Sequence, residues 1–129
     1  MKHDPMTVLN LIAQTIYDKK GINTLALDIR GISTITDFVM IAEGNVDKHV
    51  ISLASAIVEA LELIGEKPRY IEGWERGDWV VLDFMVHLFT PRVRDKYQLE
   101  QLWKEGRICD LNIILSHEPS DVYARVDRK

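Results

Sequence analysis

Residues 73–91 read Gly73-Trp74-Glu75-Arg76-Gly77-Asp78-Trp79, then Val80-Val81-Leu82-Asp83-Phe84-Met85-Val86-His87-Leu88-Phe89, and then Thr90-Pro91. The glycines of the first part are typical of a turn, and the β-branched and aromatic residues of the second are typical of strands. Thr followed by Pro suits the N-cap and first position of a helix. The stretch therefore predicts a turn, an antiparallel hairpin of strands over 78–82 and 85–89, and a mostly helical segment over 90–103.

On the N-terminal side of this stretch, apolar spacing predicts two helices and three more strands. Residues at helical spacing indicate helices over 4–20 and 46–64, with Asn45 as a plausible N-cap of the second. Residues 24–30 alternate and predict a strand with one face on the core, whereas the apolar run 38–42 predicts a strand buried on both faces. Residues 68–72 suit a short edge strand after Pro68.

The predicted order is helix, two strands, helix, three strands, helix. This order is typical of an α/β or α+β fold, with a mixed sheet of about five strands flanked by helices. A helix between the second and third strands allows those two strands to pair in parallel. Residues 1–106 form the expected domain. Residues 107–129 form a C-terminal extension, in which 107–115 has the aliphatic residues of a short packed element and the polar 116–129 is expected to be mobile.

Composition restricts the function classes. The chain has 129 residues with 20 acidic and 16 basic side chains, a net charge of −4, so a basic protein partner is favoured over direct nucleic-acid binding. No run is apolar enough for a membrane span, and no signal-peptide pattern opens the chain. The single cysteine, Cys109, excludes an internal disulfide and a cysteine zinc site, and it favours a reducing cytoplasmic compartment.

The sequence has no strong catalytic signature, because phosphate-binding glycine loops and a serine nucleophile elbow are absent and the four histidines lack metal-site spacing. The enzymatic alternative is a metal-dependent nucleotidyl or phosphoryl transferase in which Asp28, Asp37 and Asp83 hold Mg²⁺. We favour the interpretation in which these carboxylates are ordinary strand and turn residues, since the expected Asp-x-Asp pair is missing. No catalytic residue, cofactor or metal is predicted.

Trp74 and Trp79 are better candidates for binding, because tryptophan is enriched at interaction hot spots. For Trp79 a core position is equally consistent, and Trp103 is more typical of a core residue. His87 lies within a strand, where a hydrogen-bonded structural role is the commoner outcome.

Four segments occur in an order that is typical of one protein family. They are Ala26-Leu27-Asp28-Ile29-Arg30-Gly31-Ile32-Ser33-Thr34-Ile35-Thr36-Asp37-Phe38; Ile41-Ala42-Glu43-Gly44 with Lys48-His49-Val50; Glu72-Gly73 with Gly77-Asp78-Trp79-Val80-Val81-Leu82-Asp83; and Val86-His87-Leu88-Phe89-Thr90-Pro91 with Arg94, Tyr97, Leu99-Glu100 and Leu102-Trp103. Together they resemble the signatures of the ribosomal silencing factor (Iojap, RsfS) family over about residues 5–104.

The resemblance implies a fold similar to nucleotidyltransferases, without known catalysis. It implies binding to the large ribosomal subunit through an L14-type protein, which blocks the small subunit from joining and represses translation, and it implies homodimers when the protein is free. We expect the contact surface to consist of a sheet edge and turn with six residues: Trp74, Asp78, Trp79, Asp83, Phe84 and Met85.

One feature departs from the family pattern. Only Phe84, Met85 and Val86 separate Asp83 from His87, whereas family members usually have a longer turn with Gly-Asp there. A tight hairpin without Gly or Asn is disfavoured. The strands are therefore expected to be shortened, or the chain reverses differently from its relatives.

Overall fold

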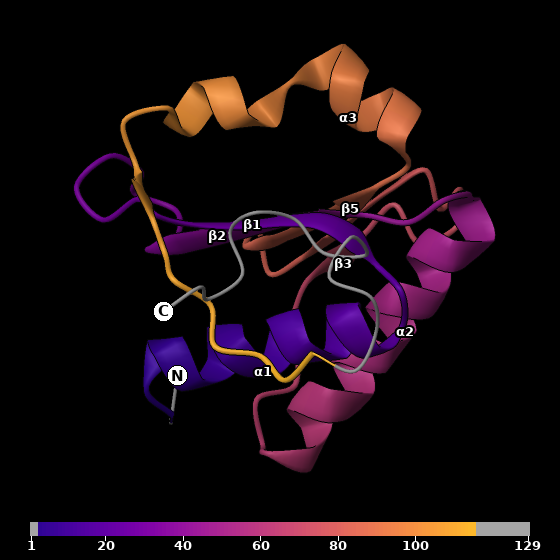
Figure 1. The fold of residues 1–129 in the computed structure, drawn as a ribbon, viewed down its shortest axis with the longest axis horizontal. Helices are drawn as coiled ribbons and strands as arrows, with labels where there is room; N and C mark the ends of the chain where they lie inside the picture. Colours follow the sequence, from indigo (N-terminus) through magenta and orange to yellow (C-terminus); the bar gives the residue numbers. More distant parts are fainter. Residues whose placement is uncertain (1–2, 116–129) are drawn as a thin grey trace.

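The computed structural model describes residues 3–115 as a six-stranded mixed sheet lying between two layers of helices (Figure 1). The elements in chain order are α1 (Pro5–Asp18), β1 (Ile22–Asp28), β2 (Phe38–Glu43), α2 (Asp47–Leu63), β3 (Ile71–Glu72), β4 (Trp79–Leu82), β5 (Val86–Phe89), α3 (Pro91–Tyr97), the 3-10 helix η1 (Leu99–Trp103) and β6 (Arg107–Ile108). Helices α1 and α2 cover one face of the sheet, and α3 with η1 covers the other. No helix within residues 3–115 is both long and apolar enough to cross a membrane.

The two long helices predicted from apolar residues at helical spacing are confirmed. Helix α1 begins at Pro5, as predicted, and its apolar face is buried against the sheet. Helix α2 buries a stripe of five residues, and its N-cap is Val46 rather than the predicted Asn45. The buried side chains of the two helices are Val8, Leu9, Ile12, Ala13, Ile16 and Tyr17 in α1, and Val50, Leu53, Ala54, Ile57 and Leu61 in α2.

Strand β2 lies inside the sheet with all six residues buried, which confirms the prediction from its continuous apolar run. The prediction for β1 was wrong, because both faces of that strand are covered. Ala26 packs in the core below α1 and α2, while Leu27 packs on the opposite side beneath η1. Ala26 was grouped with the polar residues Asp28 and Arg30 on the face expected to be exposed, because these three residues alternate with Leu25, Leu27 and Ile29.

The sheet order is β3-β4-β5-β2-β1-β6. The parallel pair predicted between the second and third strands forms elsewhere: β2 pairs in parallel with β5, with Met40 opposite Val86, and β3 pairs with β4. The antiparallel β4–β5 hairpin is confirmed. The crossover from β2 to its parallel neighbour therefore contains α2 and both strands β3 and β4.

Part of the aliphatic segment after Gly106 packs on the sheet: Leu111 is buried, whereas Ile108, Ile114 and Leu115 are 49%, 77% and 44% exposed. Strand β6 pairs with β1 and raises the sheet from about five strands to six. The amide of Cys109 donates to the carbonyl of Ala26 at 2.8 Å, and Leu111 is fully buried. The prediction of a mobile tail over 116–129 lies outside the described residues.

The shortened hairpin closes without glycine. The amide of Met85 donates to the carbonyl of Leu82 at 2.9 Å, and the two residues between them, Asp83 and Phe84, have φ of 53° and 60°. These angles define a type I′ turn, which suits the twist of a hairpin. One Asp83 carboxylate oxygen accepts hydrogen bonds from the amides of Arg69 and Tyr70 at 2.8 and 2.9 Å. The segment before β3 therefore stabilises the turn.

Replacing Asp83 by alanine is expected to lower the free energy of unfolding by about 2 kcal/mol, because two amides lose their acceptor and alanine tolerates positive φ poorly. Chemical denaturation of the purified protein measures this effect. Asp83→Asn is the matched control, since asparagine keeps an acceptor oxygen and tolerates this backbone conformation, and it should lose less than half as much. Equal losses for the two variants would contradict the role assigned to the Asp83 oxygen.

The predicted helical segment over 90–103 divides in two. Thr90 is the N-cap of α3 with Pro91 in the first turn, as predicted. The helix ends because Gln98 adopts φ of 48°, and its amide donates back to the carbonyl of Arg94 at 2.9 Å. The 3-10 helix η1 then runs across the same face of the sheet (Figure 1).

Candidate functional site

The six residues predicted to form one contact surface lie in four places. Trp74 and Asp78 precede β4, whereas Asp83 and Phe84 follow it in the hairpin turn. Trp79 packs in the cluster beneath α3 and η1. Met85 is partly buried and packs on the opposite side, against the core formed with α1 and α2.

Trp79 and Phe84 nevertheless share an open groove of about 600 Å³ on the α3 side of the sheet. We call this the aromatic groove. Strands β4 and β5 form its floor, η1 forms one wall, and the loop after β1 forms the other. Its apolar and aromatic lining consists of Ile32, Ile35, Trp79, Val81, Phe84, His87, Leu102 and Trp103.

The two walls carry exposed aliphatic side chains that the sequence analysis did not select. Ile35 is 72% exposed and Leu102 is 67% exposed. Ile32 and Ile35 are isoleucines inside a polar connecting segment, where burial in the core does not account for them. Two isoleucines in an otherwise polar loop therefore indicate a surface that contacts a partner, and this pattern was visible in the sequence.

A hydrogen bond holds the aromatic floor in place. The indole N–H of Trp79 donates to Nδ1 of His87 at 3.3 Å, and the Trp79 ring also lies 5.0 Å from the ring of Tyr97. The His87 ring lies 5.8 Å from that of Trp103. His87 thus has the hydrogen-bonded structural role predicted for it. Trp79 packs in the core on this side of the sheet and also lines the groove, and its role in binding stays a prediction.

Burial lowers the pKa of His87 to about 4, and a hydrogen bond to the backbone of Phe84 opposes this only in part. The imidazole is therefore neutral at pH 7, which leaves Nδ1 free to accept from Trp79. Protonation would place a positive charge among aromatic rings and remove that acceptor. The floor of the groove is consequently an uncharged surface at neutral pH.

This depressed pKa predicts a loss of stability in acid. The ordinary histidine pKa of about 6.5 applies to the unfolded chain, so between the two values the unfolded state binds a proton that the folded state excludes. The free energy of unfolding is expected to fall by about 2 kcal/mol from roughly pH 7.5 to roughly pH 5. Denaturation across this range should show the decrease in the wild type and a much flatter profile in His87→Phe; parallel profiles would refute the assignment.

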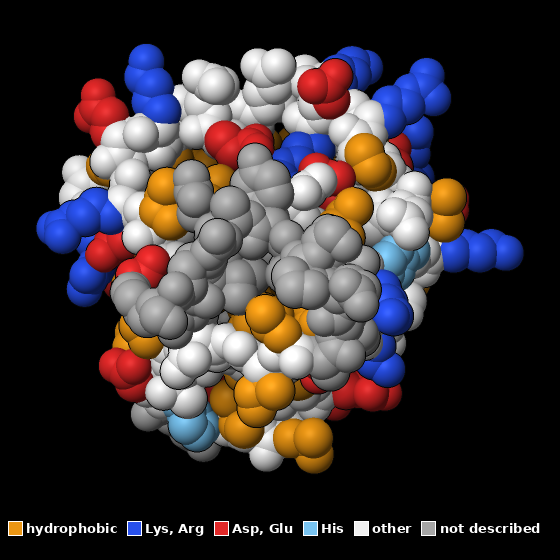
Figure 2. Space-filling model, viewed as in Figure 1, with side chains coloured by type: hydrophobic (Ala, Val, Ile, Leu, Met, Phe, Trp, Pro, Cys, Tyr) orange, Lys and Arg blue, Asp and Glu red, His pale blue; other side chains and the backbone are white. Residues whose placement is uncertain are grey.

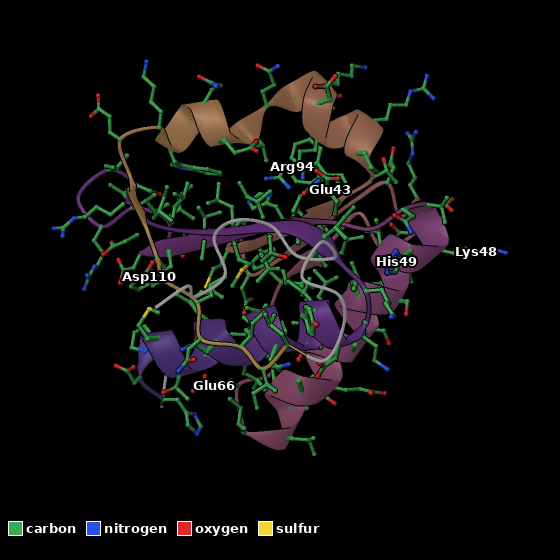
Figure 3. The ribbon with its side chains drawn as sticks, viewed as in Figure 1. Glu43, Lys48, His49, Glu66, Arg94 and Asp110 are labelled. Carbon is green, nitrogen blue, oxygen red and sulfur yellow. The ribbon has the colours of Figure 1, made fainter. Side chains whose placement is uncertain are left out.

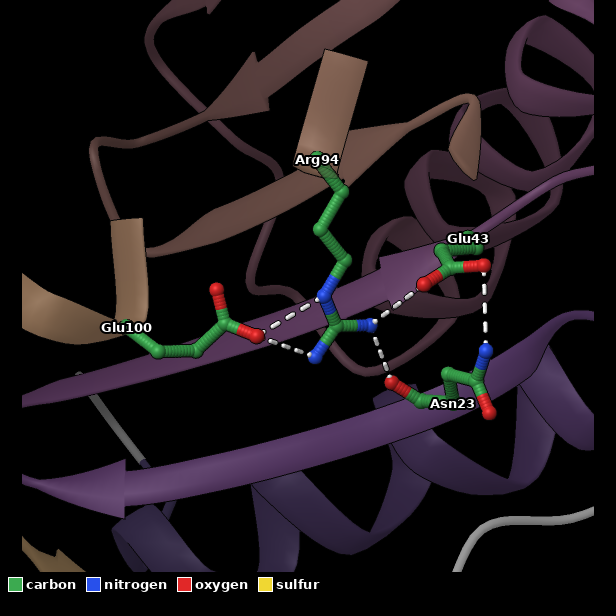
Figure 4. A network of polar contacts seen from close by, with 4 residues as sticks. All are labelled: Asn23, Glu43, Arg94 and Glu100. Carbon is green, nitrogen blue, oxygen red and sulfur yellow. Dashed lines mark hydrogen bonds and ion pairs between the residues drawn. The ribbon is translucent and has the colours of Figure 1, made fainter. Parts of the chain in front are cut away.

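A largely buried ion network joins the sheet to α3 and η1 (Figure 4). We call it the Arg94 network, and it consists of Asn23, Glu43, Arg94 and Glu100. Nη1 of Arg94 donates to a Glu43 carboxylate oxygen at 3.1 Å and to the carbonyl oxygen of Asn23. Nε and Nη2 both reach one Glu100 oxygen at 2.9 Å. Figure 3 shows Arg94 and Glu43 meeting between α3 and the sheet.

His49 has a comparable structural role where α1 ends and α2 begins. Its Nδ1 accepts the amide of Asn45 at 2.9 Å, and its Nε2 lies 2.8 Å from the carbonyl oxygen of Lys19. These contacts join the start of α2 to the end of α1, and Figure 3 shows His49 at that end of α2. The residue is thus part of the scaffold rather than of the groove.

The carboxylates of the transferase hypothesis do not assemble into a metal site. Asp28 binds the guanidinium of Arg30 at 2.6 and 3.0 Å, and these hydrogen bonds hold its pKa below the ordinary range. Asp83 uses its carboxylate on backbone amides, and Asp37 is exposed. Between residues 3 and 115, no three His, Cys, Asp or Glu side chains converge as a possible metal-binding group. The geometry gives the transferase hypothesis no support.

Surface charge has no single sign in the view of Figure 2, where acidic and basic side chains both occur around the outline of the molecule. Near the groove, Arg76 faces Asp78 at 3.6 Å, and Glu72 lines the groove itself. The outline of the molecule in Figure 2 therefore shows no continuous basic stripe of the kind that is typical of proteins bound to a phosphate backbone.

Comparison with known proteins gives concordant matches. The family model described as "Ribosomal silencing factor during starvation" matches residues 2–128. The chain is 34% identical over 109 residues to the ribosomal silencing factor RsfS of Bacillus subtilis, covering 82% of this chain and 92% of that protein. A crystal structure of a Chromobacterium violaceum protein matches with a TM-score of 0.76 and 26% identity, covering 92% of this chain and 99% of that one.

A more distant relative is the mouse protein named "Mitochondrial assembly of ribosomal large subunit protein 1". It is 31% identical over 74 residues, which cover 53% of this chain and 32% of the mouse protein.

Proposed function

Because the chain belongs to the ribosomal silencing factor family, we propose that it binds the large ribosomal subunit through an L14-type protein and keeps the small subunit from joining. Translation would be repressed without any chemical step, since a folded domain on the intersubunit face excludes the other subunit sterically. The name of the mouse relative, which refers to the ribosomal large subunit, supports the choice of subunit. The proposed compartment is the cytoplasm, where free subunits occur.

The aromatic groove is the observation that carries this proposal. It presents exposed apolar side chains around a neutral aromatic floor, and such surfaces are typical of protein interfaces. Trp79 would supply buried area, with Phe84 at the hairpin end. Asp78 and Trp74, at the other end of β4, would form the rim. Asp83 and Met85 would stabilise the turn, Met85 from the face of the sheet covered by α1 and α2.

The expected occupant of the groove is a basic ribosomal protein. The net charge of −4 favours a basic partner over RNA, and Glu72 lies in the groove beside the apolar lining. Direct contact with nucleic acid would then be small. In the free protein the same apolar surface would be available to a second copy, so a homodimer would compete with binding to the subunit.

Sedimentation through a sucrose gradient tests the proposed function. The protein should travel with purified large subunits and be absent from joined 70S-type particles, and adding it before the small subunits should reduce joining. Isolated L14-type protein should compete for binding, and gel filtration should show whether that protein converts a dimer to a one-to-one complex. Equal distribution between free subunits and joined ribosomes would overturn the proposal.

A further inference from the structure

The wall of the aromatic groove formed by η1 has little packing of its own. None of the five residues of η1 is buried, and only Leu99 and Trp103 contact the core on this side of the sheet. A 3-10 helix this short has weak hydrogen-bond geometry and does not persist without tertiary contacts. Leu102 is 67% exposed and has no such packing, so a further contact between η1 and the sheet would help to fix it where it lines the groove.

Arg94 supplies that contact from the interior. The residue is only 8% exposed, although arginine is rarely buried unless it is paired. Its guanidinium reaches three elements at once: β1 through the carbonyl of Asn23, β2 through Glu43, and η1 through Glu100. Among these partners, Glu100 is the one that belongs to the wall of the groove.

The sheet side of the network is fixed independently of η1. The side-chain amide of Asn23 donates to the second oxygen of Glu43 at 3.1 Å, so the carboxylate that meets Arg94 is itself held (Figure 4). The guanidinium is planar, so when its Nη1 is bound to the sheet, its Nε–H and Nη2–H groups point together toward η1. Both groups contact the same carboxylate oxygen of Glu100 at 2.9 Å.

We propose that Arg94 is a positioning residue for the aromatic groove: it transmits the position of β1 and β2 to η1 through Glu100 and so places Leu102 and Trp103 against the docked partner. This inference rests on the proposed function for its effect on binding. Arg94 does not line the groove, and it acts only through the element that does.

Glu100→Ala tests the inference without removing the buried pair. The Glu100 side chain is 33% exposed, and Arg94 keeps Glu43 in this variant, so the protein is expected to fold. Amide hydrogen exchange in residues 99–103 should become about tenfold faster, and the dissociation constant for large subunits should rise about tenfold. Exchange in α1 and α2 should stay at the wild-type rate.

Glu105→Ala is the matched control, because it removes the same charge from an exposed position just beyond η1. It should leave both exchange and binding unchanged. Arg94→Lys keeps the charge but lacks the planar fork, and it should behave like Glu100→Ala. Wild-type exchange in Glu100→Ala, or faster exchange with unaltered binding, would overturn the inference. Failure of the wild type to bind subunits would instead refute the proposed function, and the exchange comparison would still decide whether Glu100 holds η1.

Discussion

Arg94→Met is expected to lower the free energy of unfolding by about 3–5 kcal/mol in chemical denaturation at neutral pH. The Arg94 and Glu43 side chains are 9% and 10% exposed, so the methionine variant leaves a carboxylate buried without its cation. Desolvation of an unpaired charge costs far more than the loss of a surface ion pair. The carbonyl oxygen of Asn23 and the carboxylate of Glu100 lose the same donor group.

A double variant separates the lost pair from lost packing. Arg94→Met combined with Glu43→Leu removes both charges and keeps apolar volume, so it should be more stable than Arg94→Met alone. The surface pair Arg76 and Asp78, 3.6 Å apart with exposed side chains, provides the control. Arg76→Met should change stability by less than about 0.5 kcal/mol. A double variant as unstable as the sum of its two single variants would show that the buried charges are not coupled.

The sequence predicted the elements whose residues repeat locally. Helices α1 and α2 follow from apolar residues at helical spacing, and β2 follows from an apolar run with no polar face. The β4–β5 hairpin follows from two strand-forming runs close together. In each case, residues close together in the chain are enough to predict the element. Packing in the fold then buries the apolar face of the element that the sequence already favours.

Features that depend on contacts between distant residues were not predictable in this way. The pairing of β2 with β5 joins Met40 to Val86, which are separated by α2 and two strands. The Arg94 network joins positions 23, 43, 94 and 100. Glu43, Arg94 and Glu100 lie in the segments that resemble the family signatures, but nothing in the sequence indicates that these side chains meet. The aromatic groove likewise combines a loop, a hairpin and a 3-10 helix, so only Trp79 and Phe84 of its lining were selected beforehand.

The double substitution Ile35→Asp and Leu102→Asp is expected to weaken binding to the large subunit at least about 100-fold. Both side chains are mostly exposed, at 72% and 67%, so neither substitution disturbs the core and the melting temperature should stay near that of the wild type. The walls of the aromatic groove would then present charge where a partner has to be desolvated. Quantitative co-sedimentation with purified large subunits measures the effect.

The added charges make this prediction discriminating. A partner held mainly by its basic charge would bind the doubly acidic variant more tightly, whereas a partner docked in the apolar groove would be lost. Leu63→Asp with Ile114→Asp is the matched control, because these side chains are 88% and 77% exposed and lie outside the groove. The control adds the same charge and should bind at least as well as the wild type. If both double variants bind alike, the aromatic groove is not the docking surface, and contact must be sought at the edge of the sheet near Trp74.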